Sequence, residues 1–307
     1  MTTMTLTRAR PAVHVLRVSD LDAVQVDWVL DLAAGMKQSP NGWLGTLAGR
    51  TLGCFFEKPS TRTRVSFAAA AQRLGMLPLL LRPDELQLGR GEPIADTARV
   101  LSSYVSGIVL RTFSHETVEQ VAAAADVPVI NGLSDEHHPC QALADVLTLR
   151  ERFGGLEGLR LAYVGDGNNV ANSLVEAGRL TGVEVVVAAP AGFGPTIAGA
   201  NVVEDPREAV AGAHAVYTDV WVSMGDEAER EERLRELEAY RVDGRLMSFA
   251  RPDAIFLHCL PAHRGEEVTD DVIDGPQSAV SQQAANRLPT EQALLYGLIG
   301  RAPGLVL

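Results

Sequence analysis

The sequence predicts an α/β fold with two doubly wound parallel-sheet domains joined by helices. Two observations favour this class. Short apolar, β-rich runs alternate with helical patterns along the chain, as expected when helices cover both faces of parallel sheets. The alternation forms two series separated by GGLEG at 154–158, and 307 residues suffice for two cores of ordinary size.

The first series opens with a helix expected over 19–36, where Ser19 and Asp22 form an acidic variant of the capping-box pattern. Apolar runs then predict strands at 50–56, 77–81, 107–111 and 127–131. Helical patterns between and after them cover 60–75, 94–105, 115–125 and 138–153.

The second series repeats this arrangement. Its predicted strands are 159–165, 183–190, 215–220 and 254–260, and its predicted helices are 170–182, 205–213, 226–240 and 289–299. We expect residues 1–150 to form one domain and 151–287 a second, with a C-terminal helix of about 288–307 packing back on the first.

Composition excludes several classes of function. The apolar share of 46% and the charged share of 21% indicate a soluble globular protein. A net charge of −12 argues against general binding to nucleic acids or membrane surfaces, because both are polyanionic. The sequence has no Gly-Lys-Ser/Thr string, which excludes a P-loop. An anion site, if present, is therefore local.

Cysteine content and hydropathy predict a cytoplasmic setting. The chain has 3 cysteines, an odd number, spaced far apart, so no disulfide framework is expected. The first residues lack the continuous apolar core of a signal peptide. No apolar run is long enough to cross a bilayer.

Unusual polar strings follow the predicted strands. Ligands of doubly wound sheets bind beyond the carboxyl ends of the strands, so we expect the chemistry to lie at these positions. The strings are EKPSTRTR at 57–64, RTFSHE at 111–116, GLSDEHHPCQ at 132–141, DVWVSMGDE at 219–227 and HCLPAHRGEE at 258–267.

The first string predicts a phosphate site. A helix N-terminus offers free backbone N–H groups and a partial positive charge. Ser60, Thr61 and Thr63 add hydroxyl groups, and Arg62 adds a planar fork that matches phosphate oxygens. Arg62 and Arg64 diverge by roughly 200° on a helix, so only one can face a ligand. The alternative is an ordinary N-cap followed by solvated arginines.

His138 and Gln141 lie on one face of a helix start and can both donate to a carbonyl oxygen. A capping or core role for His138 is the alternative. A metal site is a further alternative, although the spacings match no standard zinc pattern. Its candidate ligands are His137, His138, His258, Cys259 and His263.

The string GDGNNV at 165–170 resembles a dinucleotide-binding turn only in part. Val170 stands where a third Gly or Ala is expected, and no acidic residue closes the next strand to hold a ribose. A nicotinamide site is therefore disfavoured. Asn169, at a helix start, can instead bind a carboxylate or an amine.

The last strands end in a carboxylate and a thiol. Asp219 can hold an amino group, or it can cap the next helix. Cys259 can be an inert buried thiol, a nucleophile, or one partner of an acid–base pair with Asp219. The Leu260–Pro261 bond can be cis, which would redirect the Leu260 carbonyl.

Taken in order, these strings resemble the aspartate/ornithine carbamoyltransferase family over nearly the whole chain. STRTR with HPCQ is similar to the carbamoyl-phosphate signature of the family, whereas DVWVSMG and HCLPAHRGEEV are similar to its ornithine branch. The resemblance implies transfer of a carbamoyl group from carbamoyl phosphate to the δ-amine of L-ornithine, giving L-citrulline in arginine metabolism. It also implies a homotrimer or a multiple of it, in the cytoplasm, with no metal or organic cofactor.

The resemblance also implies roles for individual residues, and it assigns residues 1–150 to carbamoyl phosphate and 151–287 to ornithine. Catalytic roles fall on Arg62, Arg111, His138, Asp219 and Cys259. Carbamoyl phosphate is held by Ser60, Thr61, Arg62, Thr63, Arg111, His138, Gln141, Cys259, Leu260 and Arg287, with Gln87 reaching a neighbouring subunit's site. Ornithine is held by Asn169, Asp219, Ser223 and Met224.

The chemistry of the residues fits this implication. An amine attacks a carbonyl carbon, charge grows on the oxygens, and phosphate leaves, so clustered donors lower the barrier. We expect Asp219 and a Cys259 thiolate to position the amine or to steer its proton. Three alternatives stay open: another acceptor such as putrescine, lysine or an acylated ornithine; a non-catalytic anion-binding relative; and a nicotinamide dehydrogenase.

Overall fold

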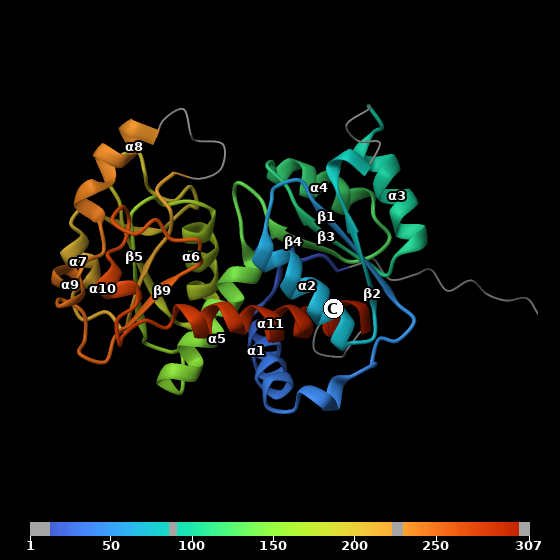
Figure 1. Ribbon diagram of the computed structural model, residues 1–307, viewed down its shortest axis with the longest axis horizontal. Helices are drawn as coiled ribbons and strands as arrows, with labels where there is room; N and C mark the ends of the chain where they lie inside the picture. The colour runs from blue at the N-terminus through green and yellow to red at the C-terminus, as the bar shows by residue number, and fades with distance from the viewer. Residues whose placement is uncertain (1–12, 86–90, 223–229, 301–307) are drawn as a thin grey trace, which may run out of the picture.

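The computed structural model describes residues 13–85, 91–222 and 230–300, which contain two parallel sheets flanked by helices (Figure 1). The first sheet has the order β2-β1-β3-β4 and the second β7-β6-β5-β8-β9. Every strand pair is parallel. The predicted fold class, with two doubly wound parallel sheets, is confirmed.

The strands are β1 Thr51–Phe56, β2 Leu77–Leu81, β3 Gly107–Arg111, β4 Val129–Leu133, β5 Arg160–Val164, β6 Glu184–Ala188, β7 Asn201–Val203, β8 Ala215–Thr218 and β9 Ile255–His258. The helices are α1 Ala23–Gln38, α2 Thr61–Arg73, α3 Ile94–Tyr104, α4 His115–Ala124, α5 Pro139–Phe153, α6 Asn169–Thr181, α7 Pro206–Val210, α8 Arg230–Leu237, α9 Gly244–Met247, α10 Asp270–Ile273 and α11 Val280–Gly300.

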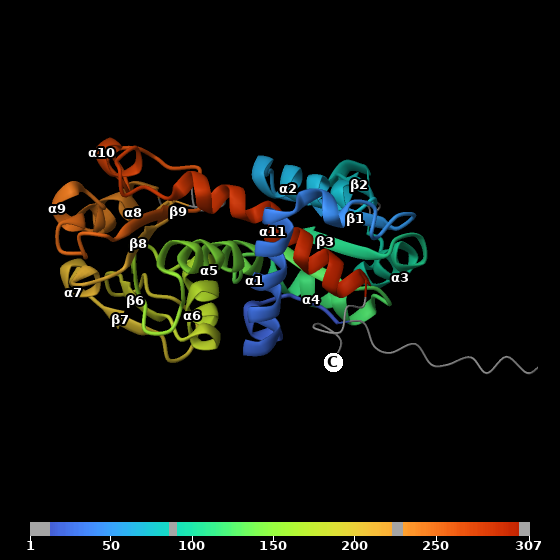
Figure 2. The same ribbon diagram turned by 90° about the horizontal axis from the view of Figure 1, so that it is seen from below.

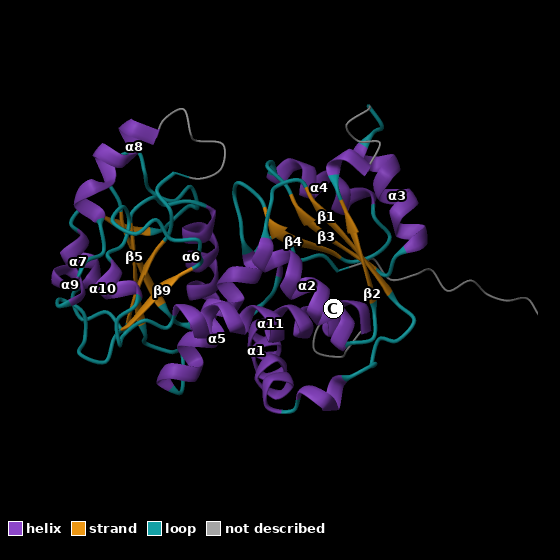
Figure 3. Ribbon diagram, viewed as in Figure 1, coloured by secondary structure: helices purple, strands orange, loops and turns teal. Residues whose placement is uncertain are grey.

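Helices flank both sheets (Figure 3), and side chains of the strands enter cores on both faces of each sheet. In β1, Cys54 points into the core shared with α2 and α5, whereas Phe55 points into the core beneath α3 and α4. In β5 of the second sheet, the adjacent residues Tyr163 and Ala162 likewise point into two different cores. This two-sided burial explains why the strands read as continuous apolar runs.

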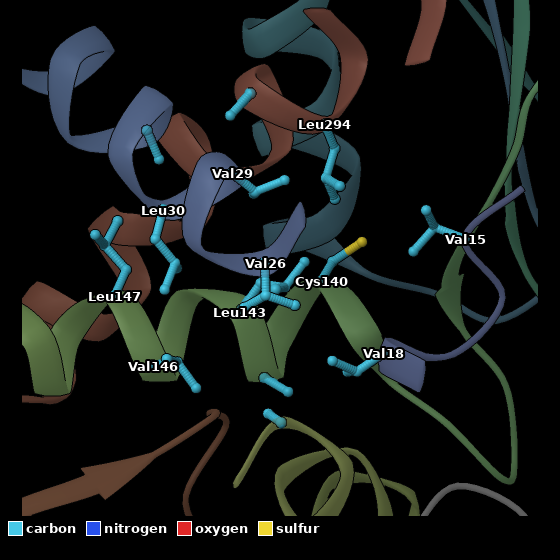
Figure 4. Packing of buried hydrophobic residues seen from close by; sticks show 14 of the residues in the cluster. Val15, Val18, Val26, Val29, Leu30, Cys140, Leu143, Val146, Leu147 and Leu294 are labelled. Carbon is cyan, nitrogen blue, oxygen red and sulfur yellow. The ribbon is translucent and has the colours of Figure 1, made fainter. Parts of the chain in front are cut away.

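Three helices, α1, α5 and α11, pack together where the two halves of the chain meet. α5 is buried along most of its length and packs against α1, α6 and α11. Val26, Leu30, Leu143, Leu147 and Leu294 meet in this shared core (Figure 4). α11 begins beside β9 and runs back to α1 and α2 of the first sheet (Figure 2). The helices beside the first sheet are therefore covered in part by the C-terminal half of α11.

Several predicted boundaries were wrong. The last helix begins at Val280 rather than at residue 289, so Pro289 lies inside α11. Asp22, not Ser19, caps α1: its carboxylate accepts from Gln25 N at 2.8 Å, and the Gln25 side chain accepts from Asp22 N. The short elements β7, α9 and α10 were not predicted, and of the helix expected over 226–240 the described part is α8.

None of the helices within the described ranges is both long enough and apolar enough to cross a membrane.

Candidate active site

The string STRTR forms the start of α2. Ser60 is the N-cap, and its hydroxyl accepts from Thr63 N at 3.2 Å. Thr61 and Arg64 are exposed, whereas Arg62 reaches across and donates to the Leu260 carbonyl oxygen. The two arginines therefore diverge as the helical spacing predicts. The start of α2 thus meets the loop after β9.

Arg111, the last residue of β3, is a buried cation that lacks a full set of partners. Its side chain is 8% exposed, and its Nε is buried with no hydrogen-bond partner among the described residues. Burial, followed by repulsion from Arg287 and Arg62, lowers the pKa of Arg111 to about 10. An anion placed here would relieve both effects.

Arg287 of α11 adds a third guanidinium to this region. Its Nη2 donates to Thr63 Oγ1 at 3.1 Å and its Nη1 to Gln141 Oε1 at 2.9 Å. Glu291, one helical turn later, accepts from Arg287 at 2.7 Å and raises its pKa, despite the opposing effect of burial. Arg287 thus stays cationic while it holds α2 and α5 together.

His138 is the N-cap residue of α5 and lies among these cations. Its backbone N–H donates to Ser173 Oγ at 2.8 Å, and its buried Nδ1 has no partner within the described part of the chain. Burial, then Arg287, Arg111 and Arg62, hold the pKa of His138 well below its ordinary value. The imidazole is therefore neutral and can donate from one nitrogen without adding charge.

Asp219 and Cys259 form a pair at the ends of β8 and β9. The Cys259 thiol donates to Asp219 Oδ1 at 2.7 Å, and Asn168 Nδ2 donates to Asp219 Oδ2 at 2.8 Å. Burial, and then the Asp219 carboxylate, raise the pKa of Cys259 well above its ordinary value. The expected Cys259 thiolate is therefore wrong for this arrangement, in which the residue is a thiol that orients the carboxylate.

Leu260 connects this pair with the arginines. Its φ of 59° is in the left-handed region, which non-glycine residues rarely adopt. Its N–H donates to His258 Nδ1 at 2.8 Å, and its carbonyl accepts from Arg62. The bond between Leu260 and Pro261 is cis, as the sequence allowed. The two hydrogen bonds aim the Leu260 carbonyl at the start of α2.

Of the remaining predicted site residues, one contacts a different loop and three lie outside the described ranges. Asn169, the first residue of α6, donates to the Ser134 carbonyl at 2.5 Å rather than toward Asp219. Gln87, Ser223 and Met224 lie outside the described residues.

Three residues that sequence reasoning missed support the site. Asn168 holds Asp219 and also caps α6, and Asp145 and Gln283 join Gln141 in a buried network. A carboxylate four positions after Gln141, within the otherwise apolar stretch 142–147, was a usable signal for Asp145. Nothing local distinguishes Gln283 from its neighbour Gln282.

The alternative metal site is not assembled from the five candidate ligands. Among the described residues, His258 and Cys259 group with Asp219, His137 with His115 and Glu136, and His263 with two glutamates. Both ring nitrogens of His258 are already engaged, by Leu260 N and by Glu267 at 3.2 Å.

The turn after β5 is also unsuited to a dinucleotide. A Cβ at Gly167 would lie 2.3 Å from Pro195 N and 2.8 Å from the Phe193 carbonyl oxygen. Gly167 N donates to that carbonyl at 2.7 Å. The small residue therefore allows a close approach of protein backbone, at the place where a pyrophosphate would have to lie.

Family models match both halves of the chain. The carbamoyl-phosphate binding domain of aspartate/ornithine carbamoyltransferase matches residues 13–151, and the aspartate/ornithine binding domain matches residues 157–298.

Individual relatives agree with these matches. The ornithine carbamoyltransferase of Acidothermus cellulolyticus is 52% identical over 95% of this chain and 98% of its own length. That of Methanoculleus marisnigri is 56% identical over 82% of this chain and 85% of its own length. The solved ornithine carbamoyltransferase of Pyrococcus furiosus superimposes with a TM-score of 0.90 at 47% identity, covering 96% of this chain and 100% of that one.

Proposed function

The chain belongs to the aspartate/ornithine carbamoyltransferase family, and we propose that it transfers the carbamoyl group of carbamoyl phosphate to the δ-amine of L-ornithine, giving L-citrulline and phosphate. One observation carries the proposal. Arg62, which belongs to a cluster of cations around a neutral His138, contacts the loop after β9 that carries Cys259, the partner of Asp219. An anionic acyl donor and a cationic amine acceptor match these two sides.

The phosphate of the donor binds at the start of α2. Hydroxyl and backbone donors come from Ser60, Thr61 and Thr63. When phosphate binds, Arg62 gives up its hydrogen bond to the Leu260 carbonyl and pairs with phosphate oxygens instead. Arg111 gains the partner that its Nε lacks, and it bridges phosphate and the carbamoyl oxygen. Gln87 of a neighbouring subunit completes the phosphate contacts.

The carbamoyl group lies between His138, Gln141 and the loop after β9. His138 and Arg111 donate to the carbonyl oxygen, on which negative charge grows in the tetrahedral intermediate. The backbone carbonyls of Cys259 and Leu260 accept from the carbamoyl NH₂ once Arg62 has turned to phosphate. Arg287 holds Gln141 and Thr63 in place from α11.

Transfer then proceeds by addition and elimination. The δ-ammonium group of bound ornithine first loses one proton to solvent. The lone pair of the resulting neutral δ-nitrogen forms a C–N bond with the carbonyl carbon, and the C–O bond to phosphate breaks with its electron pair on phosphate. Asp219 accepts a hydrogen bond from the attacking amine and orients it, and the Cys259 thiol keeps Asp219 in position. The proton lost by nitrogen passes to the leaving phosphate.

The identity of the acceptor rests on several relatives whose names specify ornithine. Asn169, Ser223 and Met224 are the residues we assign to its α-amino and carboxylate groups. Putrescine, which lacks the carboxylate, is the alternative acceptor that this assignment excludes most directly. The formation of citrulline supports our proposal that the enzyme works in arginine biosynthesis.

We also propose which part of the chain binds each substrate, and an oligomeric state. Residues 1–150, together with the part of α11 from about residue 288 onward, bind carbamoyl phosphate, and residues 151–287 bind ornithine. Exposed apolar side chains on α2, β2 and α3 support a homotrimer in which this surface is covered; among the described residues they include Val65, Leu77, Leu79, Leu80, Val100 and Tyr104. We propose the cytoplasm as its location.

The test is a direct assay of carbamoylated products from carbamoyl phosphate with L-ornithine, putrescine, L-lysine and N-acetylornithine supplied separately. We expect citrulline from ornithine, with kcat/KM for ornithine far above that for each other acceptor. A preference for putrescine or an acylated ornithine would overturn the acceptor assignment. Absence of every product would overturn the transferase activity.

A further inference from the structure

Gln283 is a fully buried residue of α11 whose side-chain amide is used at both ends. Its Nε2 donates to Asp145 Oδ1 on α5 at 2.7 Å and to the Tyr217 hydroxyl on β8 at 3.1 Å. Its Oε1 accepts from the backbone N–H of His258, the last residue of β9, at 2.9 Å. The Gln283 side chain therefore connects α11 with α5 and with the ends of β8 and β9 in the second sheet.

The contacts continue without a break to the phosphate side. Asp145 Oδ1 also accepts from Gln141 Nε2 at 2.8 Å, and Gln141 is bound in turn by Arg287, which donates to Thr63. We call Thr63, Arg287, Gln141, Asp145 and Gln283 the buried polar chain. No member is more than 3% exposed. A connected network of hydrogen bonds at this depth favours a single arrangement of its members.

We propose that Gln283 is a positioning residue that fixes the end of β9, with Cys259 and the Leu260 carbonyl, relative to the phosphate-binding start of α2. This role rests on the proposed transferase activity. The spacing matters because the amine is held on the β9 side and the carbonyl carbon on the α2 side. A misplacement of about 1 Å between reacting groups can lower a rate about 10²-fold.

An amide suits what this position requires. The side chain must donate to the Asp145 carboxylate and accept from the His258 N–H, and the Gln amide does both, through separate atoms and without charge. Leucine would leave the His258 N–H and one Asp145 contact unsatisfied in a buried setting. Glutamate would keep the acceptor but would place a second carboxylate against Asp145.

The Gln283→Leu variant separates positioning from general damage. We expect its kcat/KM for ornithine to fall about 10²-fold. Its Kd for carbamoyl phosphate, measured without ornithine, should rise far less than about 10²-fold, because Gln141, Arg287 and Thr63 keep their contacts and only the hydrogen bonds from the carbamoyl NH₂ to the Cys259 and Leu260 carbonyls are weakened. Gln282→Leu is the matched control: Gln282 is adjacent, half-buried and bonded only to Glu151 at 2.7 Å in the described part of the chain. The control should retain both constants.

The Gln283→Glu variant keeps the proposal testable if Gln283→Leu does not fold. Two facing carboxylates share one proton at low pH and repel when both ionise. The charged or titratable groups around Asp145 are Arg287 on α11, Tyr217 on β8 and Cys259 after β9. We expect kcat/KM for ornithine, relative to wild type, to fall as the pH rises through neutrality.

A second substitution should restore the bridge. In Gln283→Glu combined with Asp145→Asn, the amide nitrogen introduced on α5 donates to the new carboxylate on α11, so the ratio to wild type becomes independent of pH. A ratio for Gln283→Glu that does not change with pH, or a Gln283→Leu variant that behaves like Gln282→Leu, would overturn the role of Gln283 alone. A wild-type chain that forms no citrulline would instead overturn the proposed activity on which that role rests.

Discussion

At the residue scale, we propose that Arg111 serves a ligand rather than the fold. A buried guanidinium with an unpartnered Nε costs free energy in the unliganded protein. We therefore expect Arg111→Met to lower kcat by a factor on the order of 10²–10³, yet to raise the free energy of unfolding by ~1 kcal/mol or more. Activity assays and urea unfolding without substrates measure the two effects.

The matched control for Arg111 is Arg99→Met, which removes an exposed arginine paired with Asp96 at 2.9 Å. This substitution should leave activity unchanged and stability nearly so. A large loss of stability in Arg111→Met would show that the guanidinium is a structural group and would remove it from the phosphate site.

Asp145 lowers the stability of the protein as the pH rises, whereas carboxylates with lowered pKa values raise it. Burial raises the pKa of Asp145 to about 7, above the usual value for an unfolded chain of about 3.9. Between these values the folded state binds more protons than the unfolded state, so stability falls as the pH rises, by on the order of 1 kcal/mol per unit. In Asp145→Asn this contribution disappears.

Urea midpoints from about pH 4.5 to about pH 7.5, the range between the two pKa values, measure the effect for both proteins. We expect the difference between Asp145→Asn and wild type to grow in favour of the variant as the pH rises. A difference that is constant with pH would mean that Asp145 is ionised throughout, which would contradict the cause assigned to its raised pKa.

At the scale of elements, the start of α6 serves both the helix and the site. Asn168 Oδ1 caps α6 by accepting from Val170 N at 2.9 Å, while its Nδ2 holds Asp219. We expect Asn168→Ala to lower the free energy of unfolding by ~1 kcal/mol and also to raise KM for ornithine. Denaturant unfolding and steady-state kinetics report the two losses separately.

Asp205→Ala is the corresponding control because Asp205 caps α7 by accepting from Arg207 N at 2.9 Å and follows β7, the edge strand of the second sheet. It should cost similar stability and leave KM for ornithine unchanged. Equal kinetic constants in the two variants would mean that Asn168 acts on the helix alone.

The same elements show what the sequence could predict. Strands buried on both faces are recognisable because most of their positions are apolar, and polar strings at their ends mark the candidate site. The start of α11 was missed because Pro289 reads as a helix beginning, whereas Val280, Gln283 and Asn286 are buried by packing against distant segments. Gln283 and Asn168 gain their roles only from residues far away in sequence, so no local pattern identifies them.

At the scale of the whole molecule, the exposed face of the first sheet predicts assembly. β2 is an edge strand, and Leu77 on it is 59% exposed. An uncovered apolar edge favours association. We expect sedimentation to give a mass of three times 32.8 kDa, or a multiple of that value. Replacing Leu77 and Leu80 with Glu should yield smaller species, and a wild-type monomer would contradict the proposed trimer.

The course of α11 also constrains how the protein is made. The helix packs on α1, α2 and α5, yet it is the last described helix to leave the ribosome. Chain synthesis proceeds from the N-terminus, so the apolar side chains of α1 and α2 that pack on α11 stay uncovered by it until the second sheet has been synthesised. The core of the first half is therefore completed only after the second half has been synthesised.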